Sequence, residues 1–302
     1  MNQQFLTELK AVTAENRIFT DEPMKKHTTF RVGGPADILV QPKGTELAAV
    51  IRLCRKYDVP YQVIGNGSNL LVGDRGIRGL VIEMLSKEDE ICVEDDCITV
   101  GAGMLLSKTA NRAAEHGLTG MEFAAGIPGS IGGAVVMNAG AYGGEMKDIL
   151  TAVTVLDQEG NEKILSAEEL ELGYRTSCIL KKGYIVTGAK IKLKHGEETA
   201  IRARMEELKK QRVEKQPLEY PSAGSTFKRP EGYFAGKLIM DAGLRGYLVG
   251  EAQVSEKHCG FVINRGNATA ADIRNLMQNV ADIVEEKFGV RLEPEVKMIG
   301  EF

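Results

Sequence analysis

The stretch GIPGSIGGAVVMNAGAYGGE, residues 126 to 145, restricts the fold of this 302-residue chain more than any other segment. It holds seven glycines and a single charged residue in twenty positions. The uncharged run 123–144 is long enough to span a bilayer, but its glycines, Ser130 and Asn138 make it far less apolar than a spanning helix. Glycine permits positive φ and has no Cβ to hold a ligand away, so the stretch predicts a backbone that passes very close to something else.

Composition indicates an ordinary globular protein with a small ligand. The chain is 43% hydrophobic and 26% charged, and its length favours about two domains. The net charge is −4 with scattered Lys and Arg, which argues against nucleic acid or an anionic membrane as partner. Five cysteines without metal-site spacing and only four histidines predict no metal site. The segment MNQQFLTELK has no features of an export signal, so we expect a cytoplasmic protein with reduced thiols.

Hydrophobic periodicity predicts a mixed chain of strands and helices. The expected strands are 60–67, 79–84, 97–103, 152–157, 184–193 and 291–300. The expected helices are 45–57, 105–117, a highly charged connector within 196–219, 233–242 and 269–288, with a glycine-serine loop at 222–226. The last helix has a capping box from Thr269 to Asp272. Its expected buried stripe is Ile273, Leu276, Met277, Val280, Ile283, Val284 and Phe288.

Three glycine-rich loops, at 31–37, 65–73 and 126–145, concentrate the unusual backbone. None has the Lys and Ser or Thr of a Walker loop, and none has the third glycine of a dinucleotide fingerprint. One reading is a pair of backbone nests that hold a diphosphate through N–H groups, with the hydroxyls of Ser68 and Ser130 as further donors. The other reading is tight turns packed against neighbouring backbone. The residues alone leave both open.

Seven motifs in order carry a family resemblance: HTTFRVGGPAD, IGNGSNLLV, GIPGSIGGAVVMNAGAYGGE, GYRTS, SAGSTFKRP, HCGFVIN and LEPEVKMIG. Together they resemble the UDP-N-acetylenolpyruvoylglucosamine reductase (MurB) family over nearly the whole chain. The resemblance implies an α+β fold with a two-part FAD-binding domain of the vanillyl-alcohol-oxidase (PCMH) type at 1–197. Its subdomains are expected at about 1–84 and 85–197, followed by an α+β substrate-binding domain at 198–302.

The resemblance also implies non-covalent FAD, with NADPH as the hydride donor. The motifs assign the glycine-rich loops to the FAD diphosphate and its neighbouring ribityl chain, and His27 is expected to be structural. The residues expected to bind the cofactor are Gly65, Asn66, Gly67, Ser68, Asn69, Leu70, Gly126, Ile127, Pro128, Gly129, Ser130, Gly132, Gly133, Asn138 and Gly140.

The implied reaction is reduction of UDP-N-acetylglucosamine enolpyruvate to UDP-N-acetylmuramate in peptidoglycan precursor synthesis. By motif, Arg175 and Glu295 are expected to polarise the substrate carboxylate and stabilise an enol-like intermediate, and Ser225 to donate the proton. A serine hydroxyl is a weak acid, so a nearby cation is expected to support it. Lys228 and Lys237 are both candidates.

Further residues of the family-like segments are expected near the uridine diphosphate or the sugar. They are Tyr174, Lys237, Gln253, His258 and Asn264, of which His258 and Asn264 have a second reading as partners of buried backbone. Only fifty positions separate Arg175 from Ser225, which is similar to the shorter form of the family that lacks an inserted tyrosine loop.

The expected ligands are the UDP-sugar and NADPH, with no nucleic acid, membrane or obligate protein partner. Three alternatives stay open at this point: another FAD-dependent oxidoreductase of the same fold, a flavin-free protein that binds sugar nucleotides, and a scaffold with glycine-rich turns. A bound flavin would separate the first of these from the other two.

Overall fold

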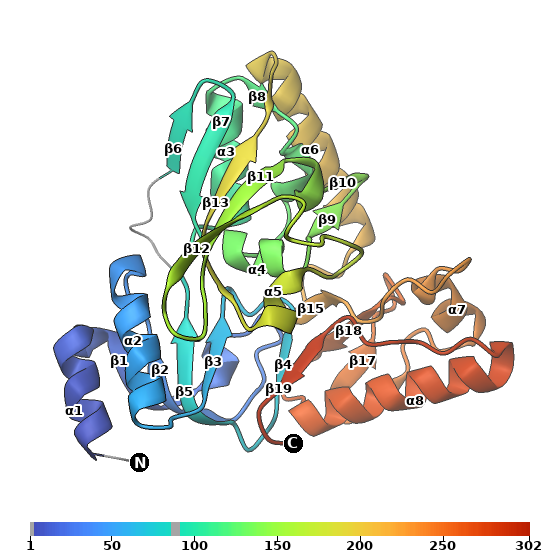
Figure 1. The fold of residues 1–302 in the computed structure, drawn as a ribbon. Helices are drawn as coiled ribbons and strands as arrows, with labels where there is room; N and C mark the ends of the chain where they lie inside the picture. The colour runs from blue at the N-terminus through green and yellow to red at the C-terminus, as the bar shows by residue number, and fades with distance from the viewer. Residues whose placement is uncertain (1–2, 86–90) are drawn as a thin grey trace. The chain divides into compact units, whose positions relative to one another are not determined.

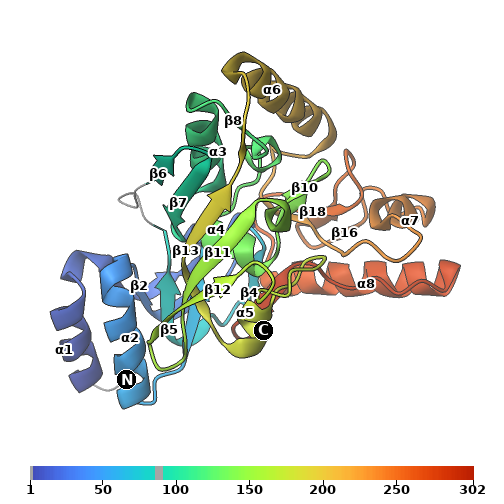
Figure 2. The same ribbon diagram turned by 45° about the horizontal axis from the view of Figure 1, so that its top comes forward.

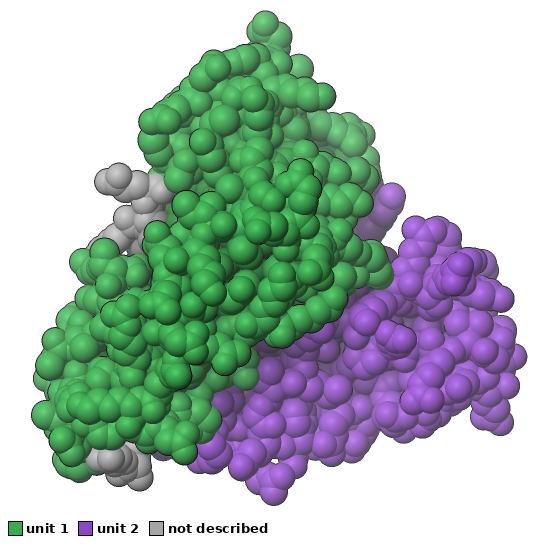
Figure 3. All heavy atoms as spheres, in the orientation of Figure 1, with its two compact units in different colours: residues 1–19, 38–66, 79–211 green, residues 20–37, 67–78, 212–302 purple. Residues whose placement is uncertain are grey.

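The computed structural model describes residues 3–85 and 91–302 of the chain (Figure 1). These residues form two compact units, neither continuous in sequence (Figure 3). Unit 1 comprises residues 1–19, 38–66 and 79–211, and unit 2 comprises residues 20–37, 67–78 and 212–302. The division differs from the predicted boundary between residues 197 and 198, since unit 1 extends to residue 211 and two early segments belong with the C-terminal third.

Eight α-helices and nineteen strands make up the described chain. The helices are α1 (Gln3–Val12), α2 (Gly44–Lys56), α3 (Leu106–Glu115), α4 (Ile131–Val136), α5 (Cys178–Lys182), α6 (Glu198–Lys215), α7 (Ala235–Asp241) and α8 (Ala270–Phe288). The strands up to residue 101 are β1 (Ile18–Pro23), β2 (Pro35–Val40), β3 (Tyr61–Ile64), β4 (Leu70–Val72), β5 (Ile77–Glu83), β6 (Ile91–Glu94) and β7 (Cys97–Gly101). The middle strands are β8 (Leu118–Thr119), β9 (Gly140–Ala141), β10 (Gly144–Glu145), β11 (Leu150–Leu156), β12 (Glu162–Ser166), β13 (Ile185–Lys192) and β14 (Lys194–His195). The last are β15 (Ser222–Ser225), β16 (Leu248–Val249), β17 (Ala252–Val254), β18 (Phe261–Asn264) and β19 (Lys297–Ile299).

The first core of unit 1 lies beneath α1 and α2. Apolar residues spaced three and four apart give α2 one buried face, which includes Leu47, Val50 and Ile51. This face packs with residues of α1 and of the sheet β1-β2-β5-β3, in which β3 and β5 run parallel. Burial raises the pKa of the Cys54 thiol in the same core to about 12, so this cysteine is a packing residue rather than a nucleophile.

The second core of unit 1 belongs to an antiparallel sheet of order β12-β11-β13-β7-β6. Alternating residues such as Val153 and Val155 of β11 point into it, as the period of a strand requires. Helix α3 adds Leu106 and Ala110, and helix α4 adds Val135. The sheet therefore fixes the start of α4, and with it the glycine-rich stretch.

Unit 2 is built on an antiparallel sheet of order β15-β18-β17-β16, against which α8 packs. Helix α7 lies beside α8 in both ribbon views (Figure 1; Figure 2). Helix α8 begins with the predicted capping box of Thr269 and Asp272. Asp74 adds a second cap, since its carboxylate accepts hydrogen bonds of 2.8 and 2.9 Å from the amides of Ala270 and Ala271.

Several sequence expectations about elements were wrong at identifiable residues. Helix α4 lies inside the glycine-rich stretch, and strand β15 replaces the loop expected at 222–226. The strand expected at 291–300 is reduced to β19 because Pro294 and neighbouring residues make only an isolated bridge. Phe288, predicted to be buried, is 41% exposed because it is the last residue of helix α8.

Across residues 3–85 and 91–302, no helix has the length and apolarity needed to cross a membrane. The same residues contain no group of three or more His, Cys, Asp and Glu arranged to hold a metal ion.

Candidate active site

Two of the predicted cofactor segments lie side by side in unit 1. Ser130 is the N-cap of α4, and its Oγ accepts a 3.4 Å hydrogen bond from the amide of Gly133. Gly65 lies against this cap, since a Cβ added to it would come within 2.3 Å of Ser130 Oγ. Asn66 Nδ2 donates to the carbonyl of Pro128 at 2.7 Å. Ser130 is only 1% exposed, so its hydroxyl shapes the loop rather than presenting a donor at the surface.

The two glycines of α4, Gly132 and Gly133, differ in their surroundings. The amide of Gly132 donates to the carbonyl of Ala102 at 2.8 Å, and an added Cβ would lie 3.1 Å from the Ala102 Cβ. Gly133 is exposed and helical, and the nearest described atom to an added Cβ is Ser130 Oγ at an ordinary 3.5 Å. Packing thus disfavours a side chain at Gly132, whereas neither packing nor conformation within the described chain requires Gly133. Close approach of a ligand is the remaining reason at Gly133.

Residues 67–70 belong to unit 2. Gly67 has φ +60°, and an added Cβ would lie 1.9 Å from the carbonyl of His27, so only glycine fits. The carbonyl of Asn69 accepts a 2.9 Å bond from Lys297, and its Nδ2 donates to the carbonyl of Glu295 at 3.2 Å. Half-buried Ser68 and Leu70 complete the segment. These bonds fix the predicted cofactor loop to the motif LEPEV.

Ser225 is presented to solvent by a bulge at the end of β15. Ser222 pairs with Ile263 and Ser225 pairs with Phe261, so the two residues between them on β15 face a single residue on β18. Gly224 absorbs the extra residue with φ +76°. The bulge leaves the predicted proton donor exposed while its neighbours stay in the sheet.

Thr226 brings Ser225 and Glu295 to the same place in unit 2. Thr226 is fully buried, and its Oγ1 accepts a 2.9 Å bond from the amide of Val262. Its carbonyl accepts a 2.8 Å bond from the amide of Glu295. Glu295 is only 9% exposed, so its carboxylate is largely shielded from water. Sequence reasoning did not single out Thr226. The available signal was a threonine between the expected catalytic serine and the apolar Phe227.

Arg175 occupies the tip of a tight turn in unit 1. Gly173 and Thr176 exchange backbone hydrogen bonds of 3.1 and 3.3 Å, which leaves Tyr174 and Arg175 between them. Arg175 has φ +54°, a conformation that costs a non-glycine residue about 1 kcal/mol or more. Its Nη2 donates to the carbonyl of Gly140 at 3.4 Å, and its guanidinium lies 5.4 Å from the centre of the Tyr174 ring. Strain of this kind is typical of functional sites.

Asn138 is fully buried, and its side chain is directed into the protein. Its Nδ2 donates to Glu145 Oε2 at 2.7 Å and to the carbonyl of Gly173 at 3.0 Å, and its Oδ1 accepts from the amide of Lys147 at 2.9 Å. The predicted cofactor contact of Asn138 does not fit this placement, because no atom of the side chain is exposed.

The predicted substrate residues fall into exposed and buried groups. Tyr174 is 55% exposed at its turn. Lys237 is exposed on α7 and pairs with Asp241 at 2.7 Å. Gln253 is buried, with Nε2 donating to the carbonyl of Gly246 at 3.2 Å. Lys228, the other candidate cation near Ser225, pairs with Glu293 at 2.9 Å.

The side chains of His258 and Asn264 form hydrogen bonds with backbone groups, which agrees with the second of the two roles considered for them from the sequence. His258 Nδ1 accepts a 3.1 Å bond from the amide of Gly260, and burial lowers the pKa of the ring. Asn264 Nδ2 donates to the carbonyl of Phe30 at 3.0 Å, and its Oδ1 accepts from Gly266 and Ala268. His27, expected to be structural, lies 3.2 Å from the carboxylate of Glu22.

Comparison with known proteins finds a family model for each of two parts of the chain. Residues 36–166 match the family model described as FAD binding domain, and residues 216–299 match that of the UDP-N-acetylenolpyruvoylglucosamine reductase C-terminal domain. A UDP-N-acetylenolpyruvoylglucosamine reductase of Agathobacter rectalis is 57% identical, with all of both chains covered. The chain belongs to the UDP-N-acetylenolpyruvoylglucosamine reductase family. A reductase of Caldanaerobacter subterraneus is 52% identical, again with all of both chains covered.

A solved reductase of this family, from Thermus caldophilus, has the same fold. It is 40% identical with a TM-score of 0.77, covering 91% of this chain and 97% of its own. The α+β fold with an FAD-binding domain is therefore confirmed, as is the family resemblance of the seven motifs. The loops at 65–70 and 126–140 lie within the matched FAD-binding domain, whereas Arg175 lies between the two matched ranges.

Proposed function

We propose that this chain catalyses the NADPH-dependent reduction of UDP-N-acetylglucosamine enolpyruvate to UDP-N-acetylmuramate, a step in peptidoglycan precursor synthesis. The observation that carries the proposal is 57% identity to a named reductase over all of both chains, together with the match to an FAD-binding domain. The chain resembles the shorter form of the family. Because NADPH and nucleotide sugars are cytoplasmic metabolites, we place the reaction in the cytoplasm.

The glycine-rich loops fit a non-covalently bound FAD. Gly126 and Gly133 are exposed, and Gly65 packs against Ser130, so the surface around the start of α4 is uncharged and carries no side chain at these three glycines. The residues that would hold FAD are those of 65–70 and 126–133, through backbone groups that suit a diphosphate. FAD held there would supply the chemistry of hydride transfer between NADPH and the enolpyruvyl group.

Residues of the chain would stabilise the negative charge that forms on the substrate and supply the proton that completes the reduction. Hydride addition at the methylene carbon of the substrate leaves negative charge on the neighbouring carbon and its carboxylate. We assign Arg175 to that carboxylate, because a planar guanidinium binds it in two places. Glu295, shielded from water beside Thr226, would stabilise the enol-like form together with Arg175.

Ser225 would then donate the proton to the carbon. Its exposure at the bulge leaves the hydroxyl accessible, which a proton donor to a bound substrate needs. The transfer converts the hydroxyl to an alkoxide, which requires a cation or water nearby. Lys228 and Lys237 both pair with carboxylates, so neither is singled out by its partners.

The experiment that tests the function separates its two halves. The purified protein should show a visible flavin spectrum that bleaches under anaerobic NADPH and returns when the enolpyruvyl substrate is added. A yellow protein whose flavin is reduced by a small alcohol and reoxidised by oxygen, but is not reoxidised by the enolpyruvyl substrate, would support the other FAD-dependent oxidoreductase. A protein that stays colourless after incubation with FAD would support the sugar-nucleotide binder and overturn the proposal.

A further inference from the structure

Two segments of unit 1 are joined by three consecutive contacts, which we call the 136–177 seam. Ser177 Oγ donates to the carbonyl of Val136 at 2.8 Å. Asn138 Nδ2 donates to the carbonyl of Gly173 at 3.0 Å. Arg175 Nη2 donates to the carbonyl of Gly140 at 3.4 Å. The seam thus runs from the end of α4 to the turn that carries Arg175.

Asn138 is the buried centre of the seam. Its two N–H groups are both used, one on the carboxylate of Glu145 at 2.7 Å and one on the carbonyl of Gly173. Glu145 pairs with Gly140 in the hairpin β9–β10, so the first bond holds the segment that accepts the Arg175 guanidinium. The second bond holds the base of the turn itself. The side-chain amide of Asn138 therefore holds both the turn from which Arg175 projects and the segment whose carbonyl the Arg175 guanidinium contacts.

Asparagine meets the demands of this position, and aspartate does not. Residue 138 has φ +42°, which asparagine tolerates better than most residues. Two acceptors and one donor surround the side chain, and an amide group answers them with two N–H groups and one oxygen. An aspartate would place its carboxylate 2.7 Å from that of Glu145. Even when protonated, it has one O–H and cannot replace two N–H groups.

We infer that Asn138 is a positioning residue that acts through Arg175 and sets where the guanidinium meets the substrate carboxylate. The inference rests on the proposed function, in which Arg175 binds that carboxylate. Asn138 is outside the reach of any ligand because it is fully buried. Its effect must therefore pass through the turn at 173–176.

The test compares Asn138→Asp with Asn279→Asp in the FAD-loaded protein. Asn279 Nδ2 donates only to the Tyr247 hydroxyl at 3.2 Å, and a hydroxyl can turn to donate to the new carboxylate, so this matched control should behave as wild type. In Asn138→Asp, reduction by NADPH should stay near the wild-type rate. Reoxidation by the enolpyruvyl substrate should slow on the order of 100-fold, the effect of misplacing a group by about 1 Å.

Two further measurements test the same inference, one by hydrogen exchange and one by a double variant. Amide hydrogen exchange of residues 173–177 should become faster in Asn138→Asp without cofactor or substrate present. The double variant Asn138→Asp/Arg175→Lys should be reoxidised no more slowly than Arg175→Lys alone, because the two residues act as one unit. If Asn138→Asp fails to fold, Ser177→Ala removes a milder contact of the seam and should slow the same half-reaction to a smaller extent.

The inference is overturned if the Asn138→Asp protein is reoxidised at the wild-type rate, if both halves slow equally, or if the double variant is additive. A wild-type protein that the enolpyruvyl substrate does not reoxidise would overturn the proposed function instead. In that case unchanged hydrogen exchange at 173–177 would still reject Asn138 as the residue that holds the turn, and faster exchange would support it.

Discussion

Ser225 is exposed because of the single glycine before it. Gly224 has φ +76° and takes up the extra residue of the bulge, while Thr226 directly after Ser225 is completely buried. The backbone of Ser225 is therefore fixed from both sides, by the bulge at Gly224 and by the buried Thr226. The residue proposed to give the proton is thus held by its neighbours rather than by its own contacts.

Ser225→Ala should separate the two half-reactions. Loss of a proton donor slows a reaction by roughly 100- to 10,000-fold, so reoxidation of the flavin by the enolpyruvyl substrate should fall by that factor. Reduction by NADPH should stay close to wild type, because it needs no proton from this serine. Stopped-flow absorbance measures both rates. Ser166→Ala, at the end of β12 in unit 1, is the control, and equal slowing of both half-reactions in Ser225→Ala would reject the proton-donor role.

Gly133→Ala should affect stability and cofactor binding in opposite directions. Alanine in a helix is more stable than glycine by up to about 1 kcal/mol, and the added methyl meets no close atom, so the apo-protein should gain stability. FAD should bind more weakly if the cofactor backbone passes this position. Urea unfolding and a flavin titration test the two effects. Gly44→Ala, with open space at the first residue of α2, should gain stability without any loss of FAD affinity.

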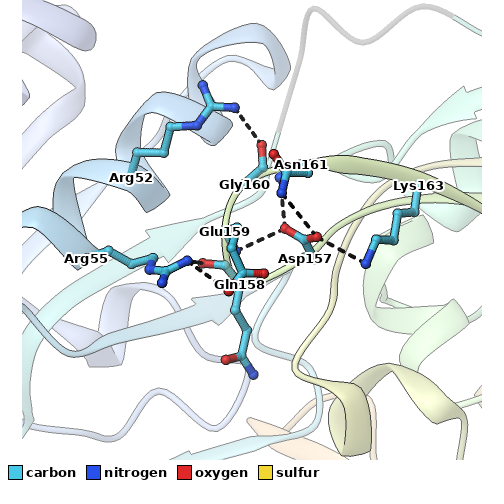
Figure 4. A network of polar contacts seen from close by, with 8 residues as sticks. All are labelled: Arg52, Arg55, Asp157, Gln158, Glu159, Gly160, Asn161 and Lys163. Carbon is cyan, nitrogen blue, oxygen red and sulfur yellow. Dashed lines mark hydrogen bonds and ion pairs between the residues drawn. The ribbon is translucent and has the colours of Figure 1, made fainter.

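At the scale of elements, the turn between β11 and β12 is organised by one buried carboxylate (Figure 4). Asp157 Oδ1 accepts bonds of 3.0 Å from the amide of Glu159 and 2.9 Å from that of Asn161, and Oδ2 lies 3.1 Å from Lys163 Nζ. From α2, Arg52 donates to the carbonyl of Gly160 at 3.0 Å. The turn therefore fastens the second sheet of unit 1 to helix α2.

The Asp157 carboxylate should make the free energy of unfolding depend on pH in the acid range. The amide of Asn161, foremost among its partners, lowers the pKa of Asp157 from 3.8 to about 2. A carboxylate with a lowered folded-state pKa contributes stability above its unfolded pKa and loses it as the pH falls through the folded value. Wild type should therefore lose stability between about pH 4 and pH 2, and Asp157→Asn should lose less over that range. Urea unfolding across this range measures the difference, and exposed Asp282→Asn should follow the wild type.

The sequence predicted long, strongly patterned elements and missed short ones. The nineteen residues of α8 have a capping box and an apolar stripe, so both ends of the helix were predicted. Helix α4 has six residues, two of them glycine, and forms only because Ala134 and Val135 pack into a core made by distant strands. Strand β15 was missed for the same reason, since its pairing with β18 overrides the local preference of Gly224.

The residues proposed as catalytic could be named only through the family resemblance. An arginine, a serine and a glutamate in separate segments have no pattern in sequence, because their roles depend on the turn at 173–176, the bulge at Gly224 and the backbone bond from Glu295 to Thr226. Asn138 is the converse case. It lies in the most unusual stretch of the chain, yet burial and three hydrogen bonds show that its side chain serves the protein itself.

At the scale of the molecule, the C-terminal strand holds an early part of the chain. Strand β19 pairs in parallel with β4, the amide of Gly73 donates to Ile299 at 3.0 Å, and that of Arg75 donates to Glu301 at 3.1 Å. Removal of residues 297–302 should cost about 2 kcal/mol or more, since each backbone bond contributes about 1 kcal/mol. Circular dichroism during urea unfolding measures the loss.

Met298→Ala is the control for this truncation. It changes a side chain that is 44% exposed and keeps every backbone bond of β19, so it should unfold like wild type. A truncated protein as stable as the full chain would show that β19 contributes nothing to unit 2.

Because unit 2 is not continuous in sequence, its parts emerge from the ribosome at different times and cannot fold together until the last part is made. Residues 20–37 and 67–78 are synthesised long before residues 212–302, with which they share a core that includes Phe30, Val32 and Leu71. At a typical elongation rate, these apolar side chains wait on the order of ten seconds for their partners. Unit 1 is complete once residue 211 has emerged, so it can fold first, while the early segments of unit 2 are the part of the nascent chain most in need of a chaperone.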